Sequence, residues 1–368
     1  TPLTEDSTAN TGHLVSALRG TVTDVDSGAL QGIAITATDA GNGTWQYSTD
    51  GGTTWNAIAG PVSATHALLL ADADRIRFVP DGHNATTASF TYRAWDRSTG
   101  TVGAYADTST HGGTSAFSSQ ENGMDITVSA VNDAPVLASD APVLNPLTED
   151  DTANAGQTVA NILGSTVSDV DAGALQGIAI TATNSGNGAW QYSTDGGTTW
   201  NTVSGLTGSN GLLLADTDRV RFVPNGENAT SASFTYHAWD RSGGTAGSLE
   251  SLATTGGTSP FSTVSNQASI AVSTVNDAPV LASDAPVLNP LTEDDTANAG
   301  QTVANILGST VSDVDAGALQ GIAITATNSG NGAWQYSTDG GTTWTTVSGL
   351  NGSNGLLLAD TDKIRFVP

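Results

Sequence analysis

The sequence contains no cysteine and has only one Met and one Lys among its 368 residues. Without cysteine the chain can form neither a disulfide framework nor a thiolate metal site, so packed cores or bound cations must stabilise it. It also lacks any run of 18 apolar residues, and its first residues lack the basic and apolar pattern of an export signal. We therefore expect no membrane span and no export signal within these residues.

Basic residues are scarce: Lys and Arg together number 10 against 36 acidic residues, for a formal net charge of −26. Such a surface repels phosphate, which argues against nucleic acid as a partner. The acidic residues are 30 Asp and only 6 Glu. Because Asp favours turns and compact cation sites, this ratio indicates more than a solubilising surface.

The chain is an internal repeat. The motif Leu-Thr-Glu-Asp begins at Leu3, Leu147 and Leu291, and Val-Asn-Asp-Ala-Pro-Val-Leu, which we interpret as a linker, begins at Val131 and Val275. Residues 134–224 and 278–368 differ at only four of 91 positions. Arrays of near-identical units are typical of proteins selected for length or multivalency. We predict three domains, at residues 1–133, 134–277 and 278–368, the last one incomplete.

Abundant Gly (43 residues), Thr, Ser and Asn favour strands and turns over helices. In the second repeat, short segments separated by Gly-rich and Asn-rich turns predict strands at residues 177–183, 189–193, 219–223, 232–239 and 268–273. Short, evenly spaced strands in a unit of this size indicate an antiparallel sandwich. The predicted fold class is all-β, with tandem β-sandwich modules in an elongated array.

The motif Ser-x-Asp-x-Gly-x-Thr-Trp begins at Ser48, Ser193 and Ser337. It resembles the Asp-box of sialidases, where the motif is a structural hairpin away from the catalytic site. A propeller of four-stranded blades would repeat it every ~40–50 residues, which the spacing here excludes. We therefore predict a hairpin in which Asp shapes the turn and Trp packs over it.

No enzyme signature is present. His237 aligns with Arg93 and His83 with Glu227, so neither histidine recurs as a general base must, and we expect both to be surface side chains. No Gly-x-Ser-x-Gly or His-Glu-x-x-His motif occurs. We predict that the chain is not an enzyme.

Acidic and amide side chains recur in register between the repeats. Carboxylate and amide oxygens suit calcium, which takes six to eight oxygen ligands. The alternative is that Asp at strand ends only forms turns, an interpretation we favour for the pairs that begin at Asp72, Asp216 and Asp360. The predicted calcium ligands are Glu5, Asp24, Asp26, Asp96, Asn132, Asp133, Glu149, Asp150, Asp169, Asp171, Asp240, Asn276, Asp277, Glu293, Asp313 and Asp315.

Taken together, these residues resemble bacterial cadherin-like and immunoglobulin-like tandem repeats, the extender modules of giant RTX-type adhesins exported by type I secretion. The resemblance implies calcium at each junction, and a secreted protein on a bacterial cell surface. It also implies contacts with neighbouring repeats, and with host or biofilm glycans or proteins through regions outside these residues. The ligands that it implies for one junction are Asn132, Asp133, Glu149, Asp169, Asp171 and Asp240.

Three functions follow as hypotheses. The first is a structural spacer that calcium stiffens at its junctions. The second is a subunit of an extracellular fibre or sheath, whose modules pair with other copies of the chain. The third repeat lacks the segments that match residues 231–240 and 269–273, and we expect further sequence or another chain to complete it by strand addition. The third is a carbohydrate-binding module with Trp95 and Trp239 as its platform, although their strand spacing favours core packing.

Overall fold

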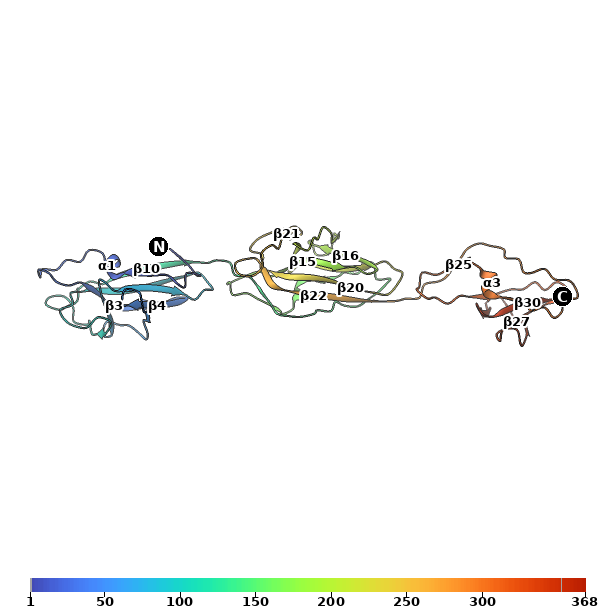
Figure 1. Ribbon diagram of the computed structural model, residues 1–368, viewed down its shortest axis with the longest axis horizontal. Coiled ribbons are helices and arrows are strands. Elements are labelled where there is room, and N and C mark those ends of the chain that lie inside the picture. The colour runs from blue at the N-terminus through green and yellow to red at the C-terminus, as the bar shows by residue number, and fades with distance from the viewer. Residues whose placement is uncertain (1, 352) are drawn as a thin grey trace.

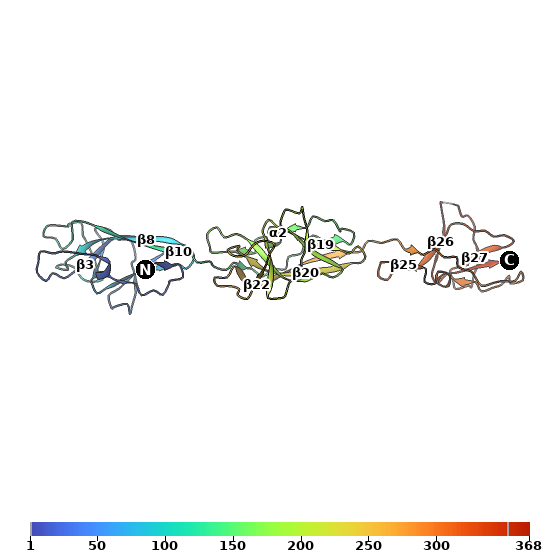
Figure 2. The ribbon, with the colours of Figure 1, turned by 90° about the horizontal axis from the view of Figure 1, so that it is seen from above.

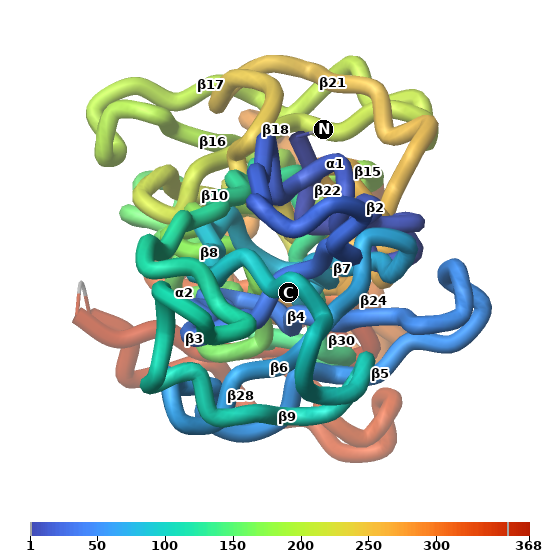
Figure 3. The backbone as a smooth tube through the Cα atoms, turned by 90° about the vertical axis from the view of Figure 1, so that its left-hand side faces the viewer, coloured from blue at the N-terminus to red at the C-terminus, as the bar shows by residue number. Residues whose placement is uncertain are grey.

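The computed structural model describes residues 2–351 and 353–368 and places three β-modules one after another along a single axis (Figure 1). We use the predicted boundaries for module 1 (2–133), module 2 (134–277) and module 3 (278–351 and 353–368). The same row is seen from above in Figure 2, and a view along the axis superposes the modules (Figure 3). Strands dominate, so the predicted all-β fold of tandem sandwiches is confirmed. No helix among the described residues is long and apolar enough to cross a membrane.

Module 2 shows the complete sandwich, which consists of a six-stranded and a four-stranded sheet. The six-stranded sheet has the order β12-β22-β20-β15-β18-β21, and the four-stranded sheet has the order β13-β19-β16-β17. In addition, β11 pairs with β14 as a separate two-stranded sheet. The elements are β11 (Val136–Leu137), β12 (Leu147–Thr148), β13 (Gln157–Thr158), α2 (Val159–Leu163), β14 (Val167–Ser168), β15 (Gly177–Asn184), β16 (Gly188–Ser193), β17 (Asn201–Thr202), β18 (Asn210–Ala215), β19 (Arg219–Pro224), β20 (Thr230–Trp239), β21 (Leu249–Ser251) and β22 (Phe261–Ser273).

Module 1 repeats this topology with sheets of order β1-β10-β8-β3-β6-β9 and β2-β7-β4-β5. Its first strand pairs in parallel with its last, so the start of the module lies beside its end. The elements are β1 (Leu3–Thr4), β2 (His13–Leu14), α1 (Val15–Leu18), β3 (Gly32–Asp39), β4 (Gly43–Ser48), β5 (Asn56–Ala57), β6 (Ala67–Ala71), β7 (Arg75–Pro80), β8 (Thr86–Trp95), β9 (Tyr105–Ala106) and β10 (Asn122–Ser129).

The core lies between the two sheets, where alternate side chains of facing strands meet. Trp190 of β16 packs edge-on against Phe222 of β19 at 5.2 Å and against Phe234 of β20 at 4.9 Å between ring centroids. Trp45 makes the same two contacts in module 1. Edge-to-face aromatic pairs of this kind contribute about 0.5–1.5 kcal/mol beyond the area they bury. Trp45 and Trp190, which hold equivalent positions in the two repeats, therefore anchor the cores of their modules.

The segment that we interpreted as a linker is partly built into module 2. After Asn132 and Asp133 the chain pairs β11 with β14, and it then runs along the outer edge of β22. Leu137 and Leu144 are buried in the hydrophobic core of module 2. The linker interpretation therefore holds for the residues at the junction and is wrong for the apolar residues that follow.

Module 3 contains the four-stranded sheet in full but only part of the other sheet. β26 pairs with β29 alone, whereas its counterpart β15 pairs with both β18 and β20. As a result Leu357 of β29 is 77% exposed, whereas Leu213 of β18 is 0% exposed. The elements are β23 (Val280–Leu281), β24 (Gln301–Thr302), α3 (Val303–Leu307), β25 (Val311–Ser312), β26 (Gly321–Ile324), β27 (Ala333–Ser337), β28 (Thr345–Thr346), β29 (Leu356–Ala359) and β30 (Lys363–Val367).

Candidate metal centres at the module junctions

Three segments of the chain bring acidic side chains together between modules 1 and 2. Glu5 directly follows β1, Asp133 lies in the segment after β10, and Asp171 lies in the loop between β14 and β15. Parallel pairing of β1 with the end of β10 is what carries Glu5 to the exit of module 1. We call these three residues, with Asn132, Asp169 and Asp240, junction 1.

The centre of junction 1 is a cluster of three carboxylates. One carboxylate oxygen from each of Glu5, Asp133 and Asp171 lies within 4.8 Å of the other two. Glu5 is 0% exposed, and its Oε1 accepts a 2.7 Å hydrogen bond from the Val131 amide while its Oε2 has no partner. The Asp133 amide donates to Asp171 Oδ2 at 2.8 Å, and Asp133 Oδ2 is buried without a partner. Buried carboxylate oxygens without partners are costly unless a proton or a cation satisfies them.

Two further acids and an amide surround this cluster. Asp169 Oδ1 accepts a hydrogen bond from the Asp171 amide at 2.9 Å, while Asp169 Oδ2 is buried and unpartnered. Asn132 Nδ2 donates to Asp240 Oδ2 at 2.9 Å and to the Asp133 carbonyl at 3.1 Å. The side chains that converge here offer only oxygen acceptors and the Asn132 amide, which is the donor set that hard divalent cations prefer.

Burial and mutual repulsion disfavour the ionised form of these acids. The pKa of Asp133 is raised, mainly because burial removes water from its carboxylate, and further because Asp171 and Asp6 carry the same charge. Burial also raises the pKa of Asp169, with added repulsion from Asp171, Asp240 and Asp133. A bound cation would reverse both effects by pairing the charges.

The junction between modules 2 and 3 repeats this geometry. Oxygens of Glu149, Asp277 and Asp315 lie within 4.8 Å of one another. Glu149 is 0% exposed and accepts from the Val275 amide at 2.6 Å, and the Asp277 amide donates to Asp315 Oδ2 at 3.0 Å. One oxygen on each of these three carboxylates is buried without a partner, whereas in the cluster of junction 1 this holds for Glu5 and Asp133 only. Burial raises the pKa of Asp277, and repulsion from Asp315, Asp150, Asp313 and Glu227 adds to it. Junction 2 comprises Glu149, Asn276, Asp277, Asp313 and Asp315.

The structure corrects the predicted grouping of one ligand. Glu149 was expected beside Asp169 and Asp171, but it lies in junction 2, and Glu5 takes the corresponding place in junction 1. The reason is the parallel pairing of β12 with the last residues of β22, which carries Glu149 to the far end of its own module. The Glu near the start of a repeat therefore lies at the junction that follows that repeat.

Several predicted ligands lie outside both clusters. Asp24 and Asp26 are exposed in module 1, where Asp24 Oδ1 accepts from the Asp26 amide at 2.8 Å, and Asp96 Oδ1 accepts from the Ser98 amide at 2.7 Å. Asp150 and Glu293 are exposed, although Asp150 is near enough to influence Asp277. Asp313 and Asn276 belong to junction 2 and lie beside its carboxylate cluster: Asp313 Oδ1 accepts from the Asp315 amide at 2.9 Å, and Asn276 Nδ2 donates to the Asp277 carbonyl at 2.9 Å.

A contact that the sequence did not predict joins the modules directly. Asn84, in the turn between β7 and β8, donates from Nδ2 to the Val170 carbonyl at 3.1 Å and accepts at Oδ1 from the Ala172 amide at 2.9 Å. Asn228 makes the same two bonds to Val314 and Ala316. The only sign of this contact in the sequence is that an Asn recurs at the same position of both repeats.

The acidic pairs that we interpreted as turn formers accept hydrogen bonds within turns or pair with arginine. Asp74 Oδ2 accepts from the Ala71 amide at 2.6 Å, and Asp218 Oδ2 accepts from the Ala215 amide at 2.7 Å. Asp72 pairs with Arg19 at 2.6 Å, and Asp216 pairs with Arg241 at 3.1 Å. The carboxylates at these positions thus close turns or pair with arginine.

The Asp-box segments form the predicted hairpins. Asp50 Oδ1 accepts from the Ser48 hydroxyl at 2.7 Å and from the amides of Thr53 and Thr54, and its Oδ2 accepts from the Thr54 hydroxyl at 2.6 Å. Trp55 packs over the turn, with the Arg77 guanidinium 4.1 Å from its ring centroid. The same arrangement recurs in modules 2 and 3, which confirms a structural role for the motif.

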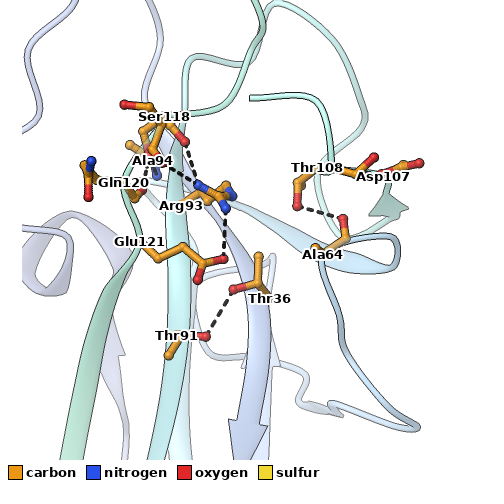
Figure 4. A network of polar contacts seen from close by, with 12 residues as sticks. Thr36, Ala64, Thr91, Arg93, Ala94, Asp107, Thr108, Ser118, Gln120 and Glu121 are labelled. Carbon is orange, nitrogen blue, oxygen red and sulfur yellow. Dashed lines mark hydrogen bonds and ion pairs between the residues drawn. The ribbon is translucent and has the colours of Figure 1, made fainter. Parts of the chain in front are cut away.

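The remaining candidate sites are structural. The indole rings of Trp95 and Trp239 are each 2% exposed, so neither offers a platform for a sugar. His237 is half-buried, so the side chain reaches the surface only in part, and its Nδ1 lies 2.7 Å from the Ser262 carbonyl. Arg93 holds the equivalent position and donates to the carbonyls of Ser118 and Ser119 (Figure 4). His237 thus contacts the neighbouring strand β22, and Arg93 binds the loop that precedes β10.

Comparisons with known proteins agree with the hairpins. The BNR/Asp-box repeat family matches residues 46–57, 191–202 and 335–346. None of the curated proteins compared with the chain matches it.

Among solved structures, human mucin-like protocadherin EC1-2 is similar at 13% identity, over 69% of this chain and 91% of that chain, with a TM-score of 0.30. The CupB6 tip adhesin from Pseudomonas aeruginosa is similar at 9% identity, over 67% and 84% of the two chains, with a TM-score of 0.20. The zebrafish RET cadherin-like domains 1 to 4 are similar at 10% identity, over 64% and 42%, with a TM-score of 0.23. At these TM-scores the similarities carry no argument about this chain's function.

Proposed function

We propose that the chain is a spacer made of stacked β-sandwich modules, in which calcium binds at each junction and stiffens the array. The observation that carries this proposal is the cluster of three carboxylates that recurs at Glu5, Asp133 and Asp171 and at Glu149, Asp277 and Asp315. All of these residues except Asp171 have a buried carboxylate oxygen without a partner. An array of this kind would project a ligand-binding region away from the surface of a bacterial cell. Its immediate partners are its own neighbouring modules.

The cation at junction 1 would be bound by residues of module 1, of module 2 and of the segment that connects the two modules. Glu5 belongs to module 1, Asp171 belongs to module 2, and Asp133 lies in the segment that connects them. Bound calcium would supply positive charge that pairs these carboxylates and so ties the three segments together. Without it, like charges at this spacing repel and favour separation of the modules.

No residue in the spacer is proposed to perform chemistry. The half-buried His237 is engaged with a backbone carbonyl, and the Asp-box carboxylates are saturated by hydrogen bonds within their own turns. The carbohydrate-binding alternative is not favoured, because the two Trp side chains that it requires are buried. We therefore propose a structural, non-enzymatic role outside the cell.

The test is a calcium titration of the full chain, followed by calorimetry and small-angle X-ray scattering. If calcium binds only the folded state, a concentration of 100 times the dissociation constant adds about 2.7 kcal/mol per site to the free energy of unfolding. We expect a rise in melting temperature and an increase in the maximum dimension of the particle, both reversed by a chelator.

A matched pair of variants locates the effect. Asp171→Asn removes a carboxylate charge from junction 1 and should abolish one of the two binding events, whereas Asp26→Asn changes the same position of module 1, away from either cluster, and should leave both intact. A wild-type chain whose melting temperature and dimensions ignore calcium would overturn the proposal. So would equal effects of the two variants.

A further inference from the structure

Basic side chains gather at one place in every module. Six of the ten Lys and Arg residues form pairs at equivalent positions of the three repeats, namely Arg75 with Arg77, Arg219 with Arg221, and Lys363 with Arg365. Each pair lies on the corresponding strand of a four-stranded sheet, which is β7, β19 or β30. The exchange of Arg219 for Lys363 is one of only four differences between residues 134–224 and 278–368, and it keeps the charge. We call each pair a basic patch.

The alternation of the strand turns both side chains of a patch away from the core. In β7 the buried Ile76 and Phe78 alternate with the half-buried Arg75 and Arg77, so the two Arg share the outer face of the sheet. Residues two apart on one strand are about 7 Å apart along it. β19 and β30 place their basic pairs at the same spacing. Two positive charges thus lie side by side on one surface of each module.

The Asp-box hairpin and the neighbouring strand hold one member of each patch in a fixed orientation. The Arg77 guanidinium lies 4.1 Å from the ring centroid of Trp55. It donates from Nε and Nη2 to Gln46 Oε1 at 2.9 and 2.7 Å, and from Nη1 to the Asn10 carbonyl at 2.8 Å. The equivalent contacts recur in modules 2 and 3. Because all these acceptors are uncharged, they orient the guanidinium without neutralising it.

No side chain of a basic patch forms an ion pair within the part of the chain that the structure describes. The ion pairs found there belong to basic residues outside the patches, namely Arg19, Arg93 and Arg241. Arg75 donates from Nη1 to the Thr11 carbonyl at 3.1 Å. Burial lowers the pKa of Arg77, because partial loss of water disfavours the cation. An anion that bound beside this guanidinium would stabilise the charged form.

We propose that the basic patches bind an acidic polysaccharide, a polymer of sugars that carry carboxylate groups. The planar guanidinium of Arg can donate two parallel hydrogen bonds to one carboxylate, and the second cation of the patch adds charge beside it. A thin polymer contacts the patch alone. A second copy of this chain would instead bring its whole net charge of −26 against an equal charge, which disfavours it as the occupant.

The array presents these patches in more than one direction. Seen along the axis, β5 and β17, which belong to the sheets that carry the patches of modules 1 and 2, lie on different sides of the row (Figure 3). Separate polymer strands can therefore bind to one array. A polymer long enough to reach two patches gains affinity because its second contact is intramolecular.

This inference goes beyond the proposed spacer and is independent of calcium. Each patch lies within one sheet of one module, and none of its residues belongs to junction 1 or junction 2. The patch also differs from a platform of Trp95 and Trp239, whose rings are buried. Failure of the binding test therefore leaves the junction proposal intact, and the reverse also holds.

The experiment measures binding of a fluorescent hyaluronan oligosaccharide, in which every second sugar carries a carboxylate, to the full chain by fluorescence anisotropy. A chelator is present, so that calcium cannot bridge acids of the protein and of the sugar. We expect saturable binding that weakens at least roughly tenfold between about 50 and about 300 mM NaCl, because salt screens exposed charge pairs. Dextran of matched length, which is uncharged, should not bind.

Two triple variants with the same net charge locate the site. The patch variant, Arg75→Gln with Arg219→Gln and Lys363→Gln, removes one charge from each patch and should weaken binding at least roughly tenfold, because hydrogen bonds to a charged group are lost. The control variant, Arg19→Gln with Arg97→Gln and Arg241→Gln, removes three charges outside the patches and should weaken binding less than about twofold. Arg75→Lys with Arg219→Lys keeps the charge, as Lys363 does, and should retain binding.

NMR spectroscopy of the wild-type chain adds a measurement that needs no variant. The Nε–Hε signals of Arg75 and Arg219 should shift when hyaluronan is added, whereas that of the buried Arg93 should not. Equal binding of dextran, no binding in about 50 mM NaCl, or equal losses in the two triple variants would each overturn the proposal. So would self-association of the wild-type chain in sedimentation that the patch variant abolishes, because the occupant would then be a second copy.

Discussion

The side chain of Asn84 connects modules 1 and 2 without any cation, because its amide pairs with both the Val170 carbonyl and the Ala172 amide. Both partners belong to the loop that carries Asp169 and Asp171. The Asn therefore holds the acidic loop in place and orients it toward the connection between the modules. Each such hydrogen bond contributes about 0.5–1.5 kcal/mol net.

Asn84→Ala should loosen junction 1 while leaving each module folded. We expect weaker calcium binding at this junction, by roughly tenfold, because the acidic loop is no longer held in place before the ion binds. Isothermal titration would measure the affinity, and thermal unfolding would check the modules. The control is Asn56→Ala, which removes an exposed Asn from β5. Unchanged affinity in Asn84→Ala would show that the loop is held by other contacts.

The stability of the Asp-box hairpin should depend on the ionisation of Asp50, and therefore on pH. Hydrogen bonds from the Thr54 hydroxyl, the Thr54 amide and the Ser48 hydroxyl lower the pKa of Asp50 to about 2. Because the folded-state pKa lies below that of the unfolded chain, the carboxylate stabilises the hairpin at neutral pH. That contribution is lost as the pH falls from about 4 towards 2. The amide shift of Thr54, followed by NMR, should titrate with a midpoint near 2, and Asp50→Asn should remove this transition. A midpoint near 4 would mean that these hydrogen bonds do not hold the carboxylate.

The sequence alone predicted most acids of the junctions but not how they are grouped. Asp133, Asp169 and Asp171 were found because they recur at turns, which is local information. The place of Glu149 depends on parallel pairing of β12 with β22, two strands more than a hundred residues apart. Strand register over such a separation is fixed by packing in the folded module, which no local motif encodes. Asn84 was missed for the same reason, since its partners lie in the next module.

At the scale of strands, the strands with alternating patterns were predicted correctly, whereas a strand with a continuous apolar run was not predicted. The five strands predicted in module 2 are present as β15, β16, β19, β20 and part of β22. The run Leu212, Leu213 and Leu214 in β18 was not predicted as a strand, because it does not alternate. All three side chains are buried, since the six-stranded sheet is covered on both faces at this strand. Burial on two faces removes the period of two that identifies a half-exposed strand.

The incomplete sheet of module 3 predicts unequal stability along the chain. β15 is flanked by β18 and β20, whereas β26 is flanked by β29 only. We expect amides of β26 to exchange with solvent roughly 100-fold faster or more than their counterparts in β15, because local opening of a two-stranded sheet exposes little apolar surface. Hydrogen exchange of the full chain with mass spectrometry would measure both strands in one sample. Equal protection of β15 and β26 would contradict this prediction, because it would mean that contacts other than the pairing with β29 protect β26.

At the scale of the whole molecule, the elongated arrangement makes the two junctions local events. Each acidic cluster takes its carboxylates from one module, the following connection and the next module, and no residue belongs to both clusters. In a linear array where each unit contacts only its neighbours, stability is close to a sum of units and interfaces. Calcium bound at one junction should therefore not alter the affinity of the other, and the array should stiffen in independent steps.

The independence of the two junctions can be tested by measuring distances between the modules. Because the chain has no cysteine, spin labels can be placed at will, and Asn56→Cys, Asn201→Cys and Thr345→Cys put them at exposed, equivalent positions of β5, β17 and β28. In calcium, pulsed electron resonance should give a narrow distance distribution both for the pair in modules 1 and 2 and for the pair in modules 2 and 3.

Glu149→Gln should broaden only the second distribution and Glu5→Gln only the first, because each Glu serves the junction that follows its own module. The alternative grouping, in which Glu149 acts beside Asp169 and Asp171, requires the reverse result for Glu149→Gln. Broadening of both distributions by either variant would instead mean that the junctions are coupled through module 2. The measurement thus decides between a register set by the parallel strands β1 and β12 and one set by nearness in the sequence.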